Sequence, residues 1–381
     1  MDVMVNATNL VKGGGVQVAT SFVVEAEKAA VSDIRWHYLL SKEVAAELAA
    51  LGVEPERAYV FEDSPAHNRS CQQTIFGLER QLNPDVIFSV FGPVFMQFRS
   101  PHLMGLGNGW ITHSTWLAFK SLGSPPLIAK QFAVTFYKGY WARQADRWVV
   151  EATNSRDGML RRLHVDPAAV AVVPNSCAAL FGDARVPDAE FPAPNKTVRF
   201  LYLSAWYGHK NIQSIPRVAA ELKRLAPDRN VKFVITIPDD EPGLATLLAN
   251  AAELGVTDCI ENVGRVPLAD AVQLYASVDA CFMPSLLETF SANYPEAMAT
   301  GRPIVASDLD FAHAICGDAA TYFDPTSPEA AAHVILKLLS DPQEWQRSIN
   351  RGRAVVGALP TPHSKYISYE QLIRETAAGD C

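Results

Sequence analysis

The sequence contains few features that would cross-link the chain or hold a structural metal. Its six cysteines are far apart in the 381 residues, with no Cys-x-x-Cys and no Cys/His pair at zinc spacing. We therefore expect neither a disulfide framework nor a structural metal site. Scattered thiols of this kind fit a reducing compartment, and the predicted location is the cytoplasm.

Long apolar runs and a leader sequence are also missing. Nowhere do 18 residues run apolar without interruption, and the chain starts Met1-Asp2-Val3-Met4 rather than with basic and then apolar residues. Both observations argue against a membrane-spanning segment and against secretion. The net charge of −8 argues against a nucleic-acid partner bound through a globally basic surface.

Apolar residues, in contrast, make up 49% of the chain, and the length predicts two domains. Short apolar runs, such as 86–90, 148–150 and 200–203, alternate with segments that have apolar residues at helical spacing, such as 41–48 and 216–223. This alternation is typical of buried parallel strands joined by surface helices. The predicted fold class is therefore α/β, with doubly wound parallel sheets.

A domain boundary is predicted where this alternation stops. From 174 to 196 the chain has several prolines among acidic and small residues, and apolar runs restart afterwards. This composition favours a linker at 176–196 between Rossmann-like domains at 1–175 and 197–355. Open α/β sheets bind ligands beyond the carboxyl ends of their strands, so we expect a substrate in a cleft between the two domains.

The strongest signal for a site follows the apolar run 280–283. A loop carries Glu288, Ser291 is placed to cap a helix, and that helix carries Glu296. The two carboxylates would accept hydrogen bonds from paired sugar or ribose hydroxyls, and the amides of Phe290 and Ser291 would donate to an anion. The alternative is a solvated Glu288 and a Glu296 that caps the first helical turn.

This segment resembles the E-x7-E signature of retaining glycosyltransferases of family 4. Seven residues separate Glu288 from Glu296, and Ala-Met-Ala-x-Gly-x-Pro-Ile-Val-Ala follows. Other segments resemble the family in order and spacing, more specifically in the second half of the chain and more loosely in the first: 202–211, 262–267 and 274–280, then 13–15, 145–150 and 172–175.

The resemblance implies a GT-B architecture, in which the C-terminal domain holds a nucleotide-sugar donor and the N-terminal domain holds a glycan or lipid-linked glycan acceptor. It also implies that the last helix, within 356–381, crosses back to the N-terminal domain. No cofactor and no catalytic metal are expected. Asp308-Leu309-Asp310 has the D-x-D pattern of another glycosyltransferase architecture, but it lies late in the chain, and two carboxylates alone make an incomplete Mg²⁺ site.

Two residues receive catalytic roles from the resemblance. Lys210 stands where the family places a cation against the donor diphosphate, and an ammonium group there would offset the charge that develops on the leaving nucleotide. Glu288 would contact the transferred sugar. From the sequence alone, Lys210 is equally well described as a surface lysine at the start of a helix.

Donor-binding roles follow in the same way. An arginine often accompanies the family's lysine, and here the neighbouring basic residue is a histidine. Glycines after the first strand would let main-chain amides approach the phosphates, although an ordinary flexible turn is the alternative. Glycine and arginine of the 262–267 segment would lie near the base, and the second glutamate would hold the ribose hydroxyls. The donor-binding candidates are Gly14, Gly15, His209, Gly264, Arg265, Phe290, Ser291 and Glu296.

Three residues are candidates on the acceptor side. Asn108 stands where many family members have a histidine at the end of a strand. His113 follows five residues later without an assigned catalytic role, and either a solvent-facing or a core histidine fits it. Glu151, after the apolar run 148–150, would either face the cleft between the domains or cap a helix.

Residues 99–165 combine positive charge with aromatic side chains. Nine basic residues occur there with three acidic ones, interleaved with aromatics such as Trp116, Phe136 and Trp141. This pattern fits a helix on anionic lipid headgroups or a site for a phosphorylated glycan. It would favour a lipid-linked or lipopolysaccharide-type acceptor made at the inner face of the plasma membrane. A packed domain with ordinary solvated lysines is the alternative.

The sequence thus predicts a retaining, metal-independent glycosyltransferase that moves a hexose-type sugar from a nucleoside-diphosphate donor to a glycan hydroxyl. A non-catalytic nucleotide-sugar-binding regulatory module would keep the same fold and is one alternative. An NAD-dependent dehydrogenase is the other, but the chain lacks a clean G-x-G-x-x-G with an acidic residue about 20 positions further on.

Overall fold

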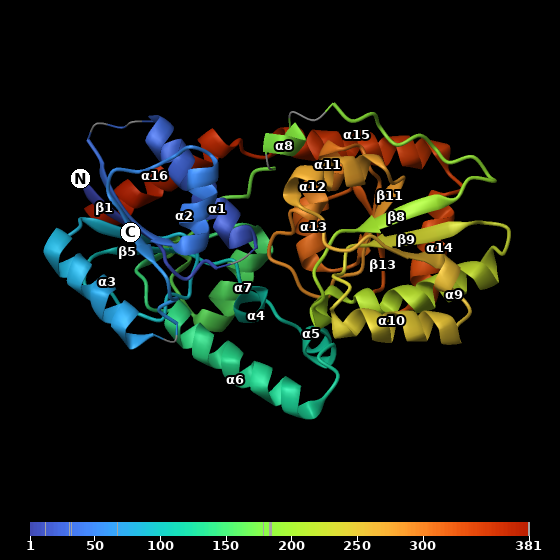
Figure 1. The fold of residues 1–381 in the computed structure, drawn as a ribbon, viewed down its shortest axis with the longest axis horizontal. Coiled ribbons are helices and arrows are strands. Elements are labelled where there is room, and N and C mark those ends of the chain that lie inside the picture. The colour runs from blue at the N-terminus through green and yellow to red at the C-terminus, as the bar shows by residue number, and fades with distance from the viewer. Residues whose placement is uncertain are drawn as a thin grey trace. The chain divides into compact units, whose positions relative to one another are not determined.

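The structure of the protein is a computed structural model that describes residues 1–11, 13–29, 31, 33–66, 68–177, 179–182 and 185–379. The chain divides into two compact units (Figure 1). Unit 1 comprises Met1–His113, Ala129–Ser176 and Pro360–Cys381, and unit 2 comprises Ser114–Ile128 and Cys177–Leu359. Residues 114–128, which the sequence analysis placed in the first domain, therefore group with unit 2.

Unit 1 alternates strands and helices through most of its described length. Its elements are β1 (Asp2–Ala7), α1 (Gly14–Ala29), β2 (Arg35–Ser41), α2 (Lys42–Ala50), β3 (Ala58–Phe61), α3 (Arg69–Leu82), β4 (Val86–Ser89), β5 (His102–Gly105), α4 (Gly109–Thr112), α6 (Pro125–Ala142, in unit 1 from Ala129), β6 (Arg147–Val150), α7 (Thr153–Leu163), β7 (Val170–Val172) and α16 (Pro362–Ala378). The described strands form one parallel sheet in the order β3-β2-β1-β4-β5-β6-β7. The central strands are almost entirely buried, as expected for a sheet covered on both faces.

Unit 2 repeats this plan. Its elements are α5 (Trp116–Lys120), α8 (Ala179–Gly182), β8 (Val198–Tyr202), the 3₁₀ turns η2 (Gly208–Lys210) and η3 (Ile212–Ser214), α9 (Ile215–Leu225), β9 (Val231–Ile235), α10 (Pro242–Glu253), β10 (Ile260–Asn262), α11 (Leu268–Ala276), β11 (Ala280–Met283), α12 (Asn293–Ala299), β12 (Ile304–Ser307), α13 (Asp310–Cys316), β13 (Ala320–Phe323), α14 (Pro328–Leu338) and α15 (Pro342–Ala358). The described strands form a second parallel sheet in the order β10-β9-β8-β11-β12-β13.

The strand order of unit 2 reverses at β8, which pairs with β9 on one side and with β11 on the other. The carboxyl ends of β8 and β11 therefore lie next to each other at one edge of the sheet. Such a switch point is where open α/β sheets bind ligands. The segments that follow these two strands carry Lys210 and Glu288, so the topology alone brings the two catalytic candidates to the same place.

The predicted linker and the C-terminal helix each pack into a hydrophobic core. Ala189, within the predicted linker, is buried in the unit 2 core, and its carbonyl accepts a hydrogen bond of 2.8 Å from the indole N–H of Trp345 in α15. At the C-terminus, α16 places Tyr366 and Tyr369 in the unit 1 core, against the ring of Phe22. The C-terminal helix is thus a structural part of unit 1.

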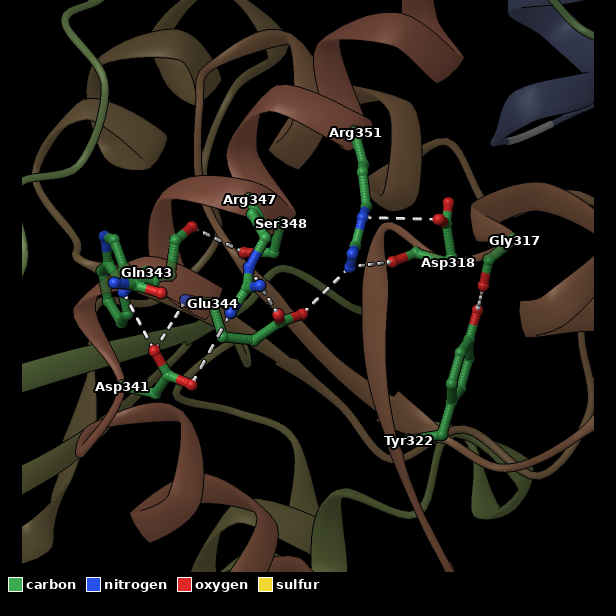
Figure 2. A network of polar contacts seen from close by, with 10 residues as sticks. Gly317, Asp318, Tyr322, Asp341, Gln343, Glu344, Arg347, Ser348 and Arg351 are labelled. Carbon is green, nitrogen blue, oxygen red and sulfur yellow. Dashed lines mark hydrogen bonds and ion pairs between the residues drawn. The ribbon is translucent and has the colours of Figure 1, made fainter.

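Helix α15 is fixed to unit 2 by a polar network (Figure 2). Asp341 caps the helix by accepting hydrogen bonds from the amides of Gln343 and Glu344. Two turns further on, Arg351 donates to Glu344 at 3.0 Å and to the carbonyl of Asp318 at 3.2 Å. Asp318 lies in the turn between α13 and β13, so a single guanidinium group ties α15 to that turn.

Candidate functional site

Lys210 and Glu288 form a buried ion pair at the switch point of unit 2. The ammonium Nζ donates to Glu288 Oε1 at 2.5 Å, and the two side chains are only 16% and 11% exposed. The segments that carry them are also joined through the main chain, because the amide of Leu286 donates to the carbonyl of His209 at 2.7 Å. The structure therefore does not show Lys210 as a snorkelling surface lysine, nor Glu288 as a solvated loop residue.

A chain of hydroxyl groups continues inward from this pair. Ser285 Oγ donates to Glu288 Oε1 at 2.8 Å, and Ser285 Oγ lies 2.6 Å from the phenol oxygen of Tyr202, the last residue of β8. Burial raises the pKa of Tyr202 to about 12, so its hydroxyl keeps its proton at neutral pH. Oε1 of the Glu288 carboxylate is thus held by both the ammonium group of Lys210 and the neutral hydroxyl of Ser285.

The charge of Lys210 depends on its partner. Burial by itself lowers the pKa of this lysine, but the Glu288 carboxylate and hydrogen bond more than offset it, and the pKa of Lys210 is raised. The ammonium group therefore stays protonated at neutral pH although it is removed from water. A positive charge held in a site of low dielectric is well suited to bind a diphosphate.

His209 does not supply a second positive charge. Its imidazole stacks on the ring of Tyr207, with the ring centres 5.6 Å apart. Burial, and then the neighbouring Lys210 charge, lower the pKa of His209 to about 4. At neutral pH the residue is a neutral imidazole that can offer a hydrogen bond to a ligand but no charge.

The second glutamate of the E-x7-E segment lies in α12 and is also buried, with 8% of its surface exposed. Glu296 Oε2 accepts a hydrogen bond of 3.1 Å from the hydroxyl of Tyr275 in α11. Burial raises the pKa of Glu296 to about 7, against which the Tyr275 hydrogen bond acts. A carboxyl group in this state can accept from ribose hydroxyls when ionised, and the structure does not show it capping the helix.

The start of α12 differs from the prediction. Ser291 was expected to cap the helix, but the N-cap residue is Ala292, and the Ser291 carbonyl accepts a hydrogen bond from the amide of Tyr294. At this first turn, the side-chain amide of Asn293 donates to the carbonyl of Leu203 after β8. Phe290, which precedes this turn, is half-buried and packs against the unit 2 core.

Gly264 and Arg265 lie in the loop after β10. Gly264 has a φ of +72°, a conformation that favours glycine, and nothing lies within 4 Å of the position that a Cβ would take. Arg265 is exposed. The main chain of this loop is therefore open to a ligand, as a role beside a nucleotide base requires.

The glycine-rich turn of unit 1 opens α1. Gly13 has a φ of +70°, and α1 begins at Gly14. A Cβ on Gly14 would meet nothing within 4 Å, whereas a Cβ on Gly15 would lie 3.2 Å from the side chain of Leu10. Gly13 is thus favoured as glycine by its conformation, a Cβ on Gly15 would press on the Leu10 side chain, and Gly14 leaves the first turn of the helix open.

Two acceptor-side candidates lie around α4. Asn108 is the N-cap residue of this short helix, and its buried Oδ1 has no hydrogen-bond partner among the residues that the structure describes. His113 is buried, with Nδ1 2.8 Å from the hydroxyl of Thr112 and Nε2 3.4 Å from the side-chain amide of Asn154. Of the two descriptions left open for His113, the structure shows the core histidine.

The third acceptor-side candidate, Glu151, belongs to a buried network that the sequence did not reveal. The amide of Asn175 donates to Glu151, and the Asn175 carbonyl oxygen accepts from the ammonium group of Lys365 in α16. Burial lowers the pKa of Lys365 to about 8, which the Glu151 carboxylate partly opposes. Ala152, not Glu151, is the N-cap residue of α7, so the capping role is not what the structure shows.

The two aspartates of the D-x-D segment have separate places in the local structure. The Asp308 carboxylate pairs with His313 at 2.7 Å, and Asp310 is the first residue of α13. Over the described ranges of the chain, no three His, Cys, Asp or Glu side chains are grouped as metal ligands would be.

Comparison with known proteins shows what the part of the chain that carries this geometry is similar to. Residues 187–355 match the family described as Glycosyl transferases group 1. The chain is 25% identical over 231 residues to the MMP alpha-(1->4)-mannosyltransferase of Mycolicibacterium hassiacum, across 60% of this chain and 54% of that protein. It is 31% identical over 177 residues to the O-antigen chain mannosyltransferase B of Escherichia coli, across 46% and 44%. The chain thus spans about half the length of the curated relatives it matches.

The fold is shared over nearly the whole chain. The structure of HepE from Anabaena in complex with UDP and glucose superposes with a TM-score of 0.69, covering 98% of this chain and 99% of that one at 15% identity. The predicted α/β class and the predicted resemblance to these glycosyltransferases are therefore confirmed. The chain has the GT-B fold, and its residues 187–355 match the group 1 family of glycosyltransferases.

Proposed function

We propose that this chain is a retaining glycosyltransferase that moves a hexose-type sugar from a nucleoside-diphosphate sugar to a hydroxyl of a glycan without a catalytic metal. The observation that carries the proposal is the buried pair of Lys210 and Glu288 at the switch point of unit 2. It combines a protonated ammonium group with an oriented carboxylate, the two groups needed by a diphosphate and by a sugar.

Lys210 would act on the leaving group. As the bond between the anomeric carbon and the phosphate oxygen breaks, negative charge grows on the diphosphate, and the fixed ammonium group stabilises that charge more than it stabilises the ground state. Glu288 would accept hydrogen bonds from the hydroxyls of the transferred sugar and hold its ring for attack. Glu296, with its pKa near 7, would accept from the ribose hydroxyls.

The acceptor hydroxyl would attack from the face that the nucleotide leaves, which retains the anomeric configuration. Its oxygen bonds to the anomeric carbon, and its proton passes to the phosphate oxygen that departs. No protein nucleophile is required in this sequence of events. The protein contributes orientation and charge stabilisation.

The relatives suggest the class of substrate. Two of them are named mannosyltransferases, one for an O-antigen chain, and HepE was solved with UDP and glucose. These names favour a hexose donor and a glycan acceptor of a cell-surface polysaccharide or lipopolysaccharide. The proposed location is the cytoplasm, where nucleotide sugars would be used.

The decisive experiment compares Lys210→Met with Lys223→Met, a lysine of α9 that is 51% exposed. With a panel of nucleotide sugars, we expect the first change to lower kcat roughly 100-fold or more and the second to leave it unchanged. NMR of the product would report the anomeric configuration, and EDTA would leave the rate unaltered. A wild-type protein that is stabilised by a donor but neither transfers nor hydrolyses it would identify a non-catalytic binding module instead.

A further inference from the structure

Helix α6, the long green helix of Figure 1, buries few of its residues. All of its residues are described, and only Gly139 and Ala142 are buried. An ordinary surface helix buries an apolar stripe a third or more of its circumference wide. The apolar residues of α6 are therefore turned to the outside to an unusual extent.

The exposed apolar residues of α6 form a stripe. Phe132, Phe136 and Tyr140 follow one another at a spacing of four residues, which places them on one face of the helix. Their exposed fractions are 47%, 83% and 56%. Tyr137, at the edge of this face, is 50% exposed. Contiguous aromatic surface of this kind marks an interaction site in a soluble protein.

The charges around the stripe identify the kind of partner. Between 125 and 143 the chain has Lys130, Lys138 and Arg143 and no acidic residue, although its net charge is −8. Tyrosine and tryptophan rings next to basic side chains are typical of helices that lie between headgroups and acyl chains. An acidic protein surface would match the charges but would leave the phenylalanines in water.

The three acidic residues that follow α6 most closely in the sequence have other partners. Asp146 accepts a hydrogen bond from the amide of His102, Glu151 is bonded to Asn175, and Asp157 lies 3.8 Å from its neighbour Arg156. Lys138 is half-buried, and burial lowers its pKa, whereas Lys130 and Arg143 are exposed. The positive charge available to an anionic surface outside the protein therefore lies mainly on Lys130 and Arg143.

We infer that α6 docks this chain on anionic lipid bilayers, lying in the plane of the interface with Phe132, Phe136 and Tyr140 toward the acyl chains. An α-helix of 18 residues is about 27 Å long, and in the part of the chain that the structure describes no helix is long and apolar enough to cross a membrane. The contact is thus peripheral and reversible. It goes beyond the transfer reaction proposed above and does not depend on it.

The experiment is flotation of the full chain with vesicles of phosphatidylcholine alone or with 30 mol% phosphatidylglycerol. We expect binding to the anionic vesicles only. Salt at 0.5 M should weaken this binding, because it screens the attraction between the lysines and the anionic headgroups. Phe136→Ser and Tyr140→Ser should each weaken binding roughly tenfold. Lys130→Gln should weaken it roughly fivefold. The matched control is Leu51→Ser, since Leu51 of the same unit is 61% exposed and should leave binding unchanged.

Two results would overturn the inference. One is equal binding of wild type and Phe136→Ser, with both proteins folded by circular dichroism. The other is a dimer in solution that Phe136→Ser dissociates while vesicle binding is absent, because the stripe would then be an interface between copies of the chain. Transfer to a soluble acceptor, measured with Phe136→Ser, separates this inference from the proposed function, since the variant should keep full activity there.

Discussion

Glu296→Gln tests whether burial raises the pKa of the second glutamate of the E-x7-E segment. The pKa of Glu296 is raised by burial from an ordinary 4.5 to about 7. In the unfolded chain the group ionises near 4.5, so the folded state holds a proton that the unfolded state has lost between these two values. Each pKa unit is worth about 1.4 kcal/mol, so ionising the buried group by pH 8 costs the fold about 3 kcal/mol.

The sign follows from the raised pKa. The favourable contribution of the protonated group is complete below pH 4.5 and is lost as the pH rises through 7. Glutamine keeps an oxygen that can accept from Tyr275 and cannot ionise, so the difference in unfolding free energy, variant minus wild type, should grow by about 3 kcal/mol from pH 4.5 to pH 8. Using a difference cancels every other titrating group that the two proteins share.

Urea unfolding at half-unit steps of pH measures this difference, and donor binding supplies an independent readout. Ribose hydroxyls donate to the ionised carboxylate, so donor affinity of the wild type should fall as the pH drops below 7, whereas that of Glu296→Gln should be weaker and flat. A difference in stability that stays constant from pH 4.5 to pH 8 would refute the reasoning, because it would mean that the carboxyl group ionises as freely as in water.

Three further changes test the frame around the site. Tyr202→Phe removes a buried hydroxyl from Ser285 and should cost about 1 to 2 kcal/mol of unfolding free energy, measured by urea; no loss would mean that water takes its place. Gly13→Ala should cost about 1 kcal/mol because φ is +70°, whereas Gly14→Ala should be neutral, and equal effects in thermal unfolding would contradict this. Arg351→Ala should cost at most about 1 kcal/mol, since this side chain is 36% exposed; a larger loss would show that the network of Figure 2 couples α15 to the core.

Much of the fold could be predicted because the strands are local and apolar. The apolar runs at 86–90, 148–150 and 200–203 correspond to β4, β6 and β8, with bounds that agree within two residues. Buried parallel strands are continuous apolar runs, and such runs can be recognised in the sequence. The E-x7-E segment and Lys210, which the proposal places in the site, could be singled out because they are fixed in spacing within a recognisable pattern. The strand order then explains why residues 78 positions apart meet.

The features that escaped prediction depend on contacts between distant segments. Lys365 reaches the network of Glu151 across 190 residues from Asn175, and no spacing rule links those positions. The neutral state of His209 results from its burial and from the nearby charge of Lys210, and the sequence does not show that either acts on it. Residues 114–128 join unit 2 although both flanking segments belong to unit 1, which composition does not signal.

The pair of Lys210 and Glu288 needs an explanation other than stability, and the proposed function supplies one. Taking an ammonium group and a carboxylate out of water costs more than their mutual attraction often returns, so buried ion pairs contribute little to folding and can be replaced by apolar side chains. Here the pair sits at the strand switch point, within two loops that hold it in place by a main-chain hydrogen bond. A diphosphate beside Lys210 and a sugar beside Glu288 would each take over part of the role that the other side chain now plays. Under the proposed function, the two groups pair with each other until the donor diphosphate and sugar replace these contacts.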